Sequence, residues 1–198
     1  MLCRRNDTKV SYRFANAGGY RKAGVRDDTI KKSVSLAELN CLALAEFVRM
    51  IGPVFEDSPW IANETAAQRP FATPAQLQAA LCETVRAAPE EKKLALICAH
   101  PDLVGKMGKL TAESSREQTV AGLNNLSPEE IALFQRNNAA YREKFGFPFV
   151  ICARLNKKDA ILEGFKRRLP NSREQEVHAA LEEIFKIAEL RLRDIIHD

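Results

Sequence analysis

The chain has 198 residues, of which 45% are hydrophobic, and a formal net charge of +4 at pH 7. This length and apolar content are enough for one domain with a substantial core. No apolar run approaches the ~20 residues of a membrane-spanning helix, and the first residues lack the apolar stretch of a secretory signal peptide. We therefore expect a single cytoplasmic domain without a membrane segment.

The cysteines give no sign of a disulfide framework or a metal site. The chain has five of them, an odd number, and none is in a CxxC spacing. All except Cys3 lie in apolar segments: Cys41, Cys82, Cys98 and Cys152. This distribution is typical of reduced, buried thiols in a cytoplasmic protein, and we expect no zinc site.

The positive charge is concentrated at the N-terminus. Residues 1–32 carry nine basic and three acidic side chains, a balance of +6, so residues 33–198 carry about −2. The basic segment shows no hydrophobic periodicity. It is either an arm that binds nucleic acid or directs targeting, or a disordered, dispensable extension that could also reflect an upstream start of the reading frame. We favour the extension. The predicted organisation is a basic extension over 1–32 followed by a domain over 33–198.

From residue 33 onward the chain reads as a series of helices with recognisable starts. In 33–50 the apolar residues fall on one stripe, which predicts a helix. Gly146 is expected to end the helix that begins at Ser127, and the last helix is expected to begin near Asn171 or Ser172. The predicted N-terminal caps are Ser35 with Glu38, Ser58 with Pro59, Thr73 with Pro74 and Gln76, and Ser127 with Pro128 and Glu130.

Strand signals are sparse. The best is the apolar run FPFVICARL at 147–155, which follows a Gly-Phe-Pro turn. One strand cannot build a sheet by itself. The predicted fold class is therefore all-α, a single compact domain of about eight helices.

His100 ends an apolar helical run and is followed by Pro101. Because proline cannot continue the helical hydrogen-bond ladder without cost, the helix should end there. The spacing from the preceding apolar residues places His100 on the inward side of the helix, and the dipole at a helix C-terminus favours a protonated imidazole. His100 is either a hydrogen-bonded structural histidine or a catalytic group. His178 and His197 are expected at the surface.

The segment after His100 contains two candidate helix caps, Thr111 and Ser114. Ser114 and Glu117 have the spacing of a capping box, so Glu117 is either a cap partner or an acidic partner of His100. In the second case the two side chains would form an acid–base pair tuned by burial and by each other. The amide groups at this helix start would also suit an anionic substrate.

The last helix contains an arginine in an apolar stripe. Arg191 occupies the position between Ala188 and Ile195 in the stripe formed by Val177, Leu181, Ile184, Ala188 and Ile195. A guanidinium is costly there unless it meets carboxylates or carbonyls. It either extends to solvent or pairs with an acidic side chain, or it clamps a substrate carboxylate. Arg191→Ala should raise KM or lower kcat, and could increase the stability.

Six segments in fixed order resemble the 2-oxo-4-hydroxy-4-carboxy-5-ureidoimidazoline (OHCU) decarboxylase family of uric acid degradation. Their combination is specific, above all AHPDLxGK, ExSxxEQ and FGFPFVICAR, and it covers about residues 36–195. The segments are FVRMIGPVFEDSPWIA, QRPF, LICAHPDLVGK, LTAESSREQTVAGLNNLSPEE, NNAAYREKFGFPFVICAR and EIFKIAELRL.

The resemblance implies an all-helical decarboxylase, usually a homodimer, that needs neither metal nor cofactor. Its small-molecule substrate would be OHCU, formed when urate is oxidised to 5-hydroxyisourate and that ring is hydrolysed, and its product would be (S)-allantoin. By position, His100 carries over as the catalytic histidine and Glu117 as its acidic partner. The substrate-binding residues would be Pro101, Ser114, Ser115, Arg116, Glu117, Gln118, Phe149, Val150, Ile151, Cys152, Ala153 and Arg191.

These residue types suit the implied chemistry. The substrate has a carboxylate and a hydroxyl on one ring carbon, beside a C=N bond that can accept electrons, so no pyridoxal or thiamine group is needed. His100 would transfer the proton, Glu117 would set its protonation and hold the substrate, and Arg191 would position an acidic or carbonyl group. Phe147 and Phe149 would exclude water. Which of His100 and Glu117 handles the hydroxyl proton stays open.

An alternative is a catalytically silent helical module that uses its basic extension to bind nucleic acid. It predicts salt-dependent binding that is lost when residues 1–32 are deleted. The slight acidity of residues 33–198 argues against it, and we expect no nucleic-acid partner.

Overall fold

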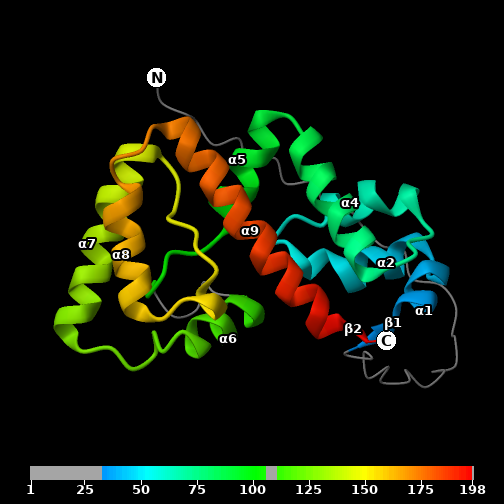
Figure 1. The fold of residues 1–198 in the computed structure, drawn as a ribbon, viewed down its shortest axis with the longest axis horizontal. Helices are drawn as coiled ribbons and strands as arrows, with labels where there is room; N and C mark the ends of the chain where they lie inside the picture. Colours follow the sequence, from blue (N-terminus) through cyan, green and yellow to red (C-terminus); the bar gives the residue numbers. More distant parts are fainter. Residues whose placement is uncertain (1–32, 106–110, 198) are drawn as a thin grey trace, which may run out of the picture. The chain divides into compact units, whose positions relative to one another are not determined.

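The computed structural model describes residues 33–105 and 111–197, and helices dominate these ranges (Figure 1). The described chain forms nine α-helices, three short 3-10 helices and one pair of two-residue strands, which confirms the all-α fold class. The predicted extension over 1–32 lies outside the described residues. The α-helices are α1 (Leu36–Cys41), α2 (Leu44–Ile51), α3 (Trp60–Thr65), α4 (Pro74–Ala87), α5 (Glu90–Ala99), α6 (Ala112–Val120), α7 (Pro128–Phe145), α8 (Lys158–Arg168) and α9 (Arg173–Ile195).

The remaining elements are short. The 3-10 helices are η1 (Gly52–Val54), η2 (Ala66–Gln68) and η3 (Ala153–Leu155), and the strands are β1 (Val34–Ser35) and β2 (Ile196–His197). The two strands pair in parallel, with Val34 opposite Ile196. The pair therefore brings the start of the described chain next to the end of α9. None of the described helices is long and apolar enough to span a membrane.

Most predicted caps are present, because a cap depends only on residues three positions apart. Ser35 and Ser127 each form a complete capping box, with Glu38 and Glu130 respectively. The Thr73 side chain accepts a hydrogen bond from the amide of Gln76, and Ser172 caps α9. Gly146 ends α7 with φ 81°, a left-handed conformation that glycine adopts without strain. Ser58 differs from the prediction: Pro59 is the N-cap of α3, and the Ser58 side chain makes no cap bond.

The predicted helix over 33–50 is split into α1 and α2. Leu42 and Ala43 are extended, with ψ of 146° and 152°. The break exposes the carbonyl of Leu42, which accepts a hydrogen bond of 2.6 Å from Arg69 Nη1. Residues 33–105 and 111–197 therefore form nine α-helices where about eight were expected, and Arg69 binds a carbonyl that a continuous helix would have used.

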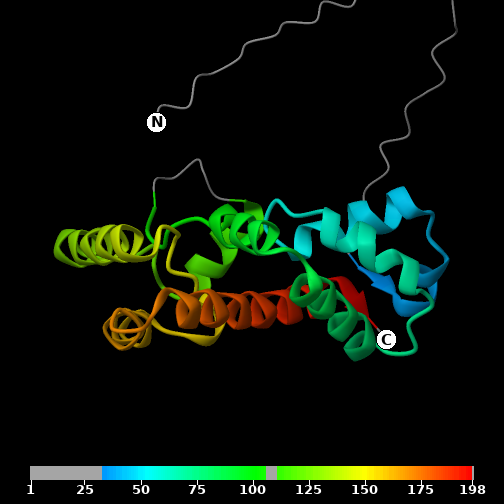
Figure 2. The same cartoon turned by 90° about the horizontal axis from the view of Figure 1, so that it is seen from above.

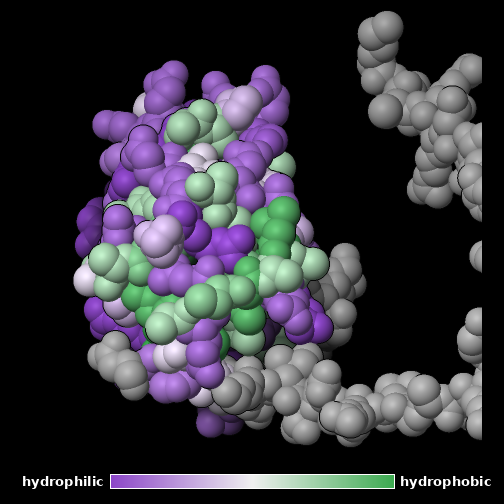
Figure 3. Space-filling view, turned by 90° about the vertical axis from the view of Figure 1, so that its right-hand side faces the viewer, coloured by the Kyte–Doolittle hydropathy of each residue, from purple (hydrophilic) through white to green (hydrophobic). Residues whose placement is uncertain are grey.

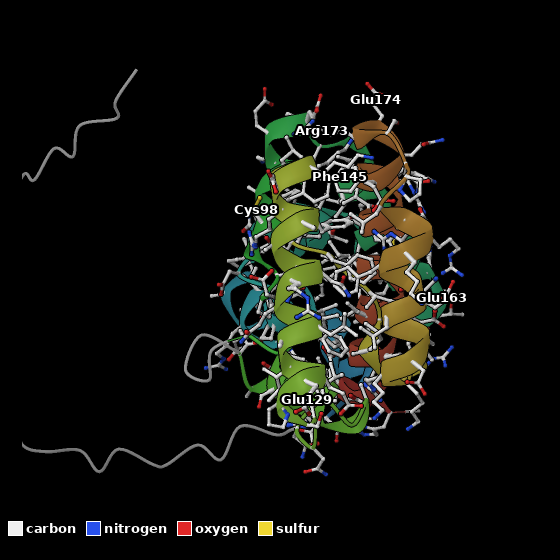
Figure 4. All side chains as sticks on the ribbon, turned by 90° about the vertical axis from the view of Figure 1, so that its left-hand side faces the viewer. Cys98, Glu129, Phe145, Glu163, Arg173 and Glu174 are labelled. Atoms are coloured by element: carbon white, nitrogen blue, oxygen red, sulfur yellow. The ribbon has the colours of Figure 1, made fainter. Side chains whose placement is uncertain are left out.

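Helix α9 is the central element of the described domain. It contacts α4, α5 and η1, while α7 packs on α8 and α6 packs on η3 (Figures 1 and 2). Aromatic rings fill the space between α7 and α8: Tyr141 lies 5.1 Å from Phe149, which stacks on Phe165 at 3.9 Å. Figure 4 shows Phe145 between these two helices and Glu163 on the outer side of α8. This aromatic packing supports the segment that follows α7.

That segment, 147–155, is not the predicted strand. It is irregular up to Cys152 and then forms η3. Side chains take the place of a neighbouring strand: Arg168 Nη1 donates to the Val150 carbonyl at 2.7 Å, and the Cys152 amide donates to Glu183 at 2.8 Å. The strand signal was weak for a physical reason: an apolar run indicates burial but does not show what satisfies its backbone.

The cysteines divide into buried and exposed ones. Cys82 and Cys152 are buried, and burial raises the pKa of the Cys82 thiol to about 11. Cys41 and Cys98 are exposed, contrary to the expectation of buried thiols, because the neighbouring core positions of their helices are taken by Leu39 and Ile97. Figure 4 shows Cys98 at the outer side of α5. Cys3 lies outside the described residues.

Apolar residues also occur on the surface around α1 and α2. Leu44, the first residue of α2, has 49% of its surface exposed. Figure 3, which faces this end of the described domain, shows apolar residues gathered beside hydrophilic ones. This surface is separate from the cavity described next, whose walls come from α5, α6, α9 and the segment 147–155.

Candidate functional site

A cavity of about 360 Å³, counting its open mouth, lies where the end of α5, the first turns of α6 and the segment after α7 meet. It gathers residues from four parts of the sequence, because α9 also contributes Ile187. Its walls are His100, Pro101, Leu103, Ser114, Glu117, Gln118, Phe149, Val150, Ile151, Ala153 and Ile187. Nine of these belong to the predicted site, and Leu103 and Ile187 are additional apolar wall residues.

Four predicted site residues do not line this cavity. Ser115 and Arg116 are exposed, because α6 turns its other side, with Ser114 and Glu117, toward the cavity. Arg191 and Cys152 are buried behind the wall, where Arg191 contacts protein carboxylates and the Cys152 amide binds Glu183. In a helix only residues three or four positions apart share a face, so the consecutive residues of a helical motif cannot all line one cavity.

His100 lies at the junction of α5 and the loop that follows. It is the C-cap of α5, with an extended backbone (φ −70°, ψ 136°) of the kind expected before proline. Its imidazole is buried, and Nδ1 makes a hydrogen bond of 2.9 Å with the Leu96 carbonyl. A carbonyl only accepts, so Nδ1 carries the hydrogen. In the neutral ring, Nε2 is then the basic nitrogen.

Burial sets the charge of His100. Desolvation lowers its pKa below the ordinary value of 6.5, and the bond to Leu96 and the nearby carboxylate of Glu56 offset this only partly. The nearby charge of Arg191 also lowers it. The helix-end dipole was expected to favour the protonated ring; instead burial dominates, and His100 is neutral at pH 7.

The start of α6 resolves the role of its two candidate caps. Thr111 is the N-cap, and its side chain accepts a hydrogen bond from the Ser114 amide at 3.2 Å. Glu117 is therefore not a cap partner. Instead its two carboxylate oxygens accept hydrogen bonds of 2.8 Å from Nε and Nη2 of Arg191. This bidentate pair fixes the carboxylate of Glu117 in the cavity wall.

Sequence reasoning missed Glu56, a second carboxylate of this cluster. Glu56 is 3% exposed and lies in the turn after η1. It accepts hydrogen bonds from Arg191 at 3.0 Å, from Thr111 at 2.6 Å and from Ser114, whose hydroxyl is 3.0 Å from both oxygens. Arg191 also donates to the Pro53 carbonyl at 3.2 Å. The one signal in the sequence was Arg191 itself, since a core guanidinium requires counter-charges.

Both ends of the Glu56–Arg191 pair are charged. Burial would raise the pKa of Glu56, but the hydrogen bond from Thr111 and the charge of Arg191 outweigh it and hold the pKa below its ordinary value. Burial would likewise lower the pKa of Arg191, but the hydrogen bond and charge of Glu117 keep it raised. Two carboxylates, those of Glu56 and Glu117, therefore surround one guanidinium in this buried cluster.

Gln118 ties α6 to the loop that carries His100. Its Oε1 accepts a hydrogen bond of 3.0 Å from the Val104 amide, and its Nε2 donates to the Asp102 carbonyl at 3.4 Å. Val104 has φ 56°, a left-handed conformation that costs a β-branched residue about 1–3 kcal/mol. Asn138 donates to the Leu103 carbonyl at 2.8 Å. These bonds hold the loop, and therefore His100, in a fixed position.

The fold and cavity define a class of protein: an all-helical domain whose cavity presents a neutral imidazole, a fixed carboxylate and a primary amide. These groups suit proton transfer and hydrogen bonding with a small polar molecule. Within 33–105 and 111–197, no group of three or more His, Cys, Asp or Glu side chains is arranged to hold a metal ion.

Comparisons with known proteins give the family. The family model described as OHCU decarboxylase matches residues 40–193. The chain is 44% identical to the 2-oxo-4-hydroxy-4-carboxy-5-ureidoimidazoline decarboxylase of Amia calva and 38% identical to that of Mus musculus. These matches cover 82% of this chain and 95% and 93% of the two relatives. The chain belongs to the OHCU decarboxylase family.

Solved structures agree. A crystal structure of (S)-allantoin synthase superposes with a TM-score of 0.65 at 31% identity, over 82% of this chain. The chain spans about half of that longer protein, 54%. A crystal structure of OHCU decarboxylase in the presence of (S)-allantoin has the same fold, with a TM-score of 0.59 at 24% identity, and the match covers 74% of this chain and 94% of that one.

Proposed function

We propose that this chain catalyses the decarboxylation of OHCU to (S)-allantoin in urate degradation, with His100 as the proton-transfer group. One observation supports this proposal: the chain belongs to the OHCU decarboxylase family, and His100, Glu117 and Gln118 line the same small cavity. Apart from these groups the walls of the cavity are mostly apolar.

The reaction can be written with the substrate ring as its own electron acceptor. When CO2 leaves, the electrons of the broken C–C bond form a C=C bond to the neighbouring carbon, and the C=N electrons move onto the ring nitrogen, which takes up a proton from solvent. The hydroxyl then loses its proton as its carbon becomes a carbonyl, and the neighbouring carbon gains one proton. The protein must orient the carboxylate and deliver that last proton to one face only.

The neutral state of His100 suits the proton transfer. Because Nδ1–H is held by Leu96, Nε2 has a free lone pair and can accept the hydroxyl proton. The same nitrogen can then donate this proton to the neighbouring carbon, which would give one enantiomer because the ring is held in a fixed position. This division of roles is supported by Glu117, whose two oxygens are both occupied by Arg191.

Glu117 and Arg191 would act as a pair. In this proposal Arg191 positions Glu117 and does not bind the substrate carboxylate directly, because its five N–H groups already face Glu117, Glu56, Ser114 and the Pro53 carbonyl. The remaining lone pairs of Glu117 would accept N–H groups of the ureido arm or the ring. Gln118 would contribute its second amide hydrogen.

The segment Phe149–Ala153 would contribute backbone groups. The Val150 carbonyl and the Cys152 amide are bound on the side of α8 and α9 by Arg168 and Glu183. Successive peptide groups of an extended chain point to opposite sides. In this proposal the amide and carbonyl of Ile151 are the groups that would meet the ring amides, while Phe149 would exclude water.

The test is to generate OHCU in situ from urate and to follow the chirality of allantoin by circular dichroism. His100→Asn should reduce the rate of (S)-allantoin formation by about 10²–10⁴-fold, the usual contribution of one acid–base group. His178→Asn is the matched control, since His178 is exposed on α9. Full activity of His100→Asn would refute the role of the imidazole, and absence of activity in the parent chain would refute the function.

Two further properties belong to this proposal. We infer from the family that the chain acts as a homodimer, which light scattering on the purified protein tests. We also infer a cytoplasmic enzyme whose first 32 residues are an extension to a domain over 33–198; removal of residues 1–32 should leave the turnover unchanged.

A further inference from the structure

Glu56 contacts the cavity wall only through other side chains. Its carboxylate lies behind α6 and accepts hydrogen bonds from Thr111 at 2.6 Å, from Ser114 at 3.0 Å and from Arg191 at 3.0 Å. It is 3% exposed and is absent from the walls of the cavity, whereas Ser114 is one of those walls. Glu56 can therefore act on the substrate through the residues that it binds, and through its charge, which acts on the nearby imidazole of His100.

The hydrogen-bond directions at Ser114 are fully determined. An ionised carboxylate only accepts, so the single hydroxyl hydrogen of Ser114 points to Glu56. A guanidinium only donates, so one lone pair of Ser114 Oγ receives Arg191 Nη2 at 3.3 Å. One lone pair of the hydroxyl is left. Ser114 can then face a ligand only as an acceptor.

We propose that Glu56 is a positioning residue that fixes Ser114 as a hydrogen-bond acceptor for an N–H group of the substrate. The proposal rests on the proposed function, because it concerns how that substrate is recognised. OHCU and (S)-allantoin both offer N–H donors on the ring and on the ureido arm. A serine with a free hydroxyl hydrogen would instead also donate, and would pair with carbonyl groups of the same ligand in a competing orientation.

The role of Glu56 is distinct from holding Arg191. Glu117 already binds Arg191 through two hydrogen bonds of 2.8 Å, and the Pro53 carbonyl binds it at 3.2 Å. No other carboxylate in the described ranges accepts the Ser114 hydroxyl. Loss of Glu56 should therefore disturb Ser114 more than it disturbs Arg191. If Glu56 acts by positioning Ser114, the effects of mutating the two residues should not add, whereas a residue that only packs should act independently of Ser114.

The experiment is a double-mutant cycle of Glu56→Gln and Ser114→Ala. The amide introduced by Glu56→Gln would present an NH2 group in place of one oxygen, so the variant is expected to release or reverse the Ser114 hydroxyl. Two quantities are measured: kcat and KM with OHCU generated in situ, and the Kd of (S)-allantoin by calorimetry as a stable probe. Glu113→Gln is the matched control, because it removes a carboxylate from the first turn of α6 and leaves the Glu56–Ser114 bonds intact.

The expected result is a rise of about tenfold in both KM and the Kd of (S)-allantoin for Glu56→Gln, corresponding to one lost hydrogen bond of about 1.4 kcal/mol. The fall in kcat should be smaller, and Glu113→Gln should match the parent. In the Ser114→Ala background, Glu56→Gln should add little. Parent-like KM and Kd in Glu56→Gln, or an undiminished effect in the Ser114→Ala background, would overturn the proposal.

Glu56→Gln could fail to fold, and circular dichroism would show this as a loss of helical signal. A second variant then tests the proposal. Glu56→Asp keeps the negative charge for Arg191 but withdraws the carboxylate by one bond length, about 1.5 Å. It should raise KM in the same way, and a parent-like KM would overturn the proposal. These outcomes concern substrate affinity alone, so they are separate from the loss of turnover in His100→Asn that tests the function.

Discussion

Replacing Arg191 with methionine should strongly destabilise the protein. Arg191→Met keeps the bulk of the side chain but leaves Glu56 and Glu117, both buried, without their counter-charge. Removing one partner of a buried ion pair costs about 3–5 kcal/mol, because a desolvated charge stays behind. For a domain of this size each kcal/mol lowers Tm by about 2–4 °C, so the expected decrease in Tm is roughly 6–20 °C.

This prediction reverses an expectation from the sequence. An isolated arginine in an apolar stripe is a cost, and replacing it could increase the stability. In the described part of the chain Arg191 is the one cation that pairs with both Glu56 and Glu117, so its removal leaves the larger penalty. The penalty should shrink as the pH falls, because the buried carboxylate of Glu56 can then take up a proton in the variant, where the charge of Arg191 no longer holds its pKa down.

Urea unfolding followed by far-ultraviolet circular dichroism measures the effect, with the slope m checked for constancy. Arg193→Met is the matched control: its side chain is 69% exposed and pairs with Glu189 on the surface, so its loss should cost less than about 1 kcal/mol. If Arg191→Met were as stable as the parent chain at neutral pH, the reasoning about the buried cluster would be wrong. Its kcat/KM should also fall, because Glu117 loses the group that orients it.

Two other predictions concern the pH dependence and the cavity wall. Because the pKa of His100 in the folded chain lies below 6.5, the unfolded chain binds the proton first as the pH falls. The free energy of unfolding should therefore decrease below about pH 6.5, by up to ~1.4 kcal/mol per pH unit. In urea unfolding measured over a series of pH values, His100→Asn should remove this decrease. Glu183→Ala should raise KM several-fold, because the buried Cys152 amide loses its acceptor, at a cost of about 1–3 kcal/mol. Lys186→Ala, which removes only the other partner of Glu183, should leave KM unchanged, and an equal effect of both variants would contradict this role.

The parts of the fold that could be predicted are those governed by neighbours in sequence. Caps at Ser35, Thr73, Ser127 and Ser172 satisfy amides three residues away, so their patterns were sufficient. At Thr111 and Ser114 the same local rule fitted two residues equally well. Only the long-range bonds of Ser114 to Glu56 decide between them.

The parts that could not be predicted depend on partners far away in the chain. The break after α1 is stabilised by Arg69, and the irregular segment after α7 is held by Arg168 and Glu183. None of these three partners is marked by periodicity. In both cases an apolar pattern correctly indicated burial, but the backbone conformation was set by a charged side chain in another element.

The candidate site was predicted through family resemblance more than through spacing. His100 and Arg191 stood out by themselves, as an imidazole before proline and a cation in an apolar stripe. Glu56 did not, because an acidic residue in a turn is ordinary, and it lies 58 residues from Ser114 and 135 from Arg191. Its role follows from burial and from three hydrogen-bond donors around one carboxylate.

The parallel pairing of Val34 with Ile196 also has a practical consequence for engineering. Because the chain enters and leaves the helical domain at neighbouring points, a short glycine-rich linker could join these two positions. The backbone could then be opened instead at Asn124–Asn125, in an exposed turn between α6 and α7. Such a circular permutant would leave α9 continuous and would show whether the helices assemble independently of the order in which they are synthesised.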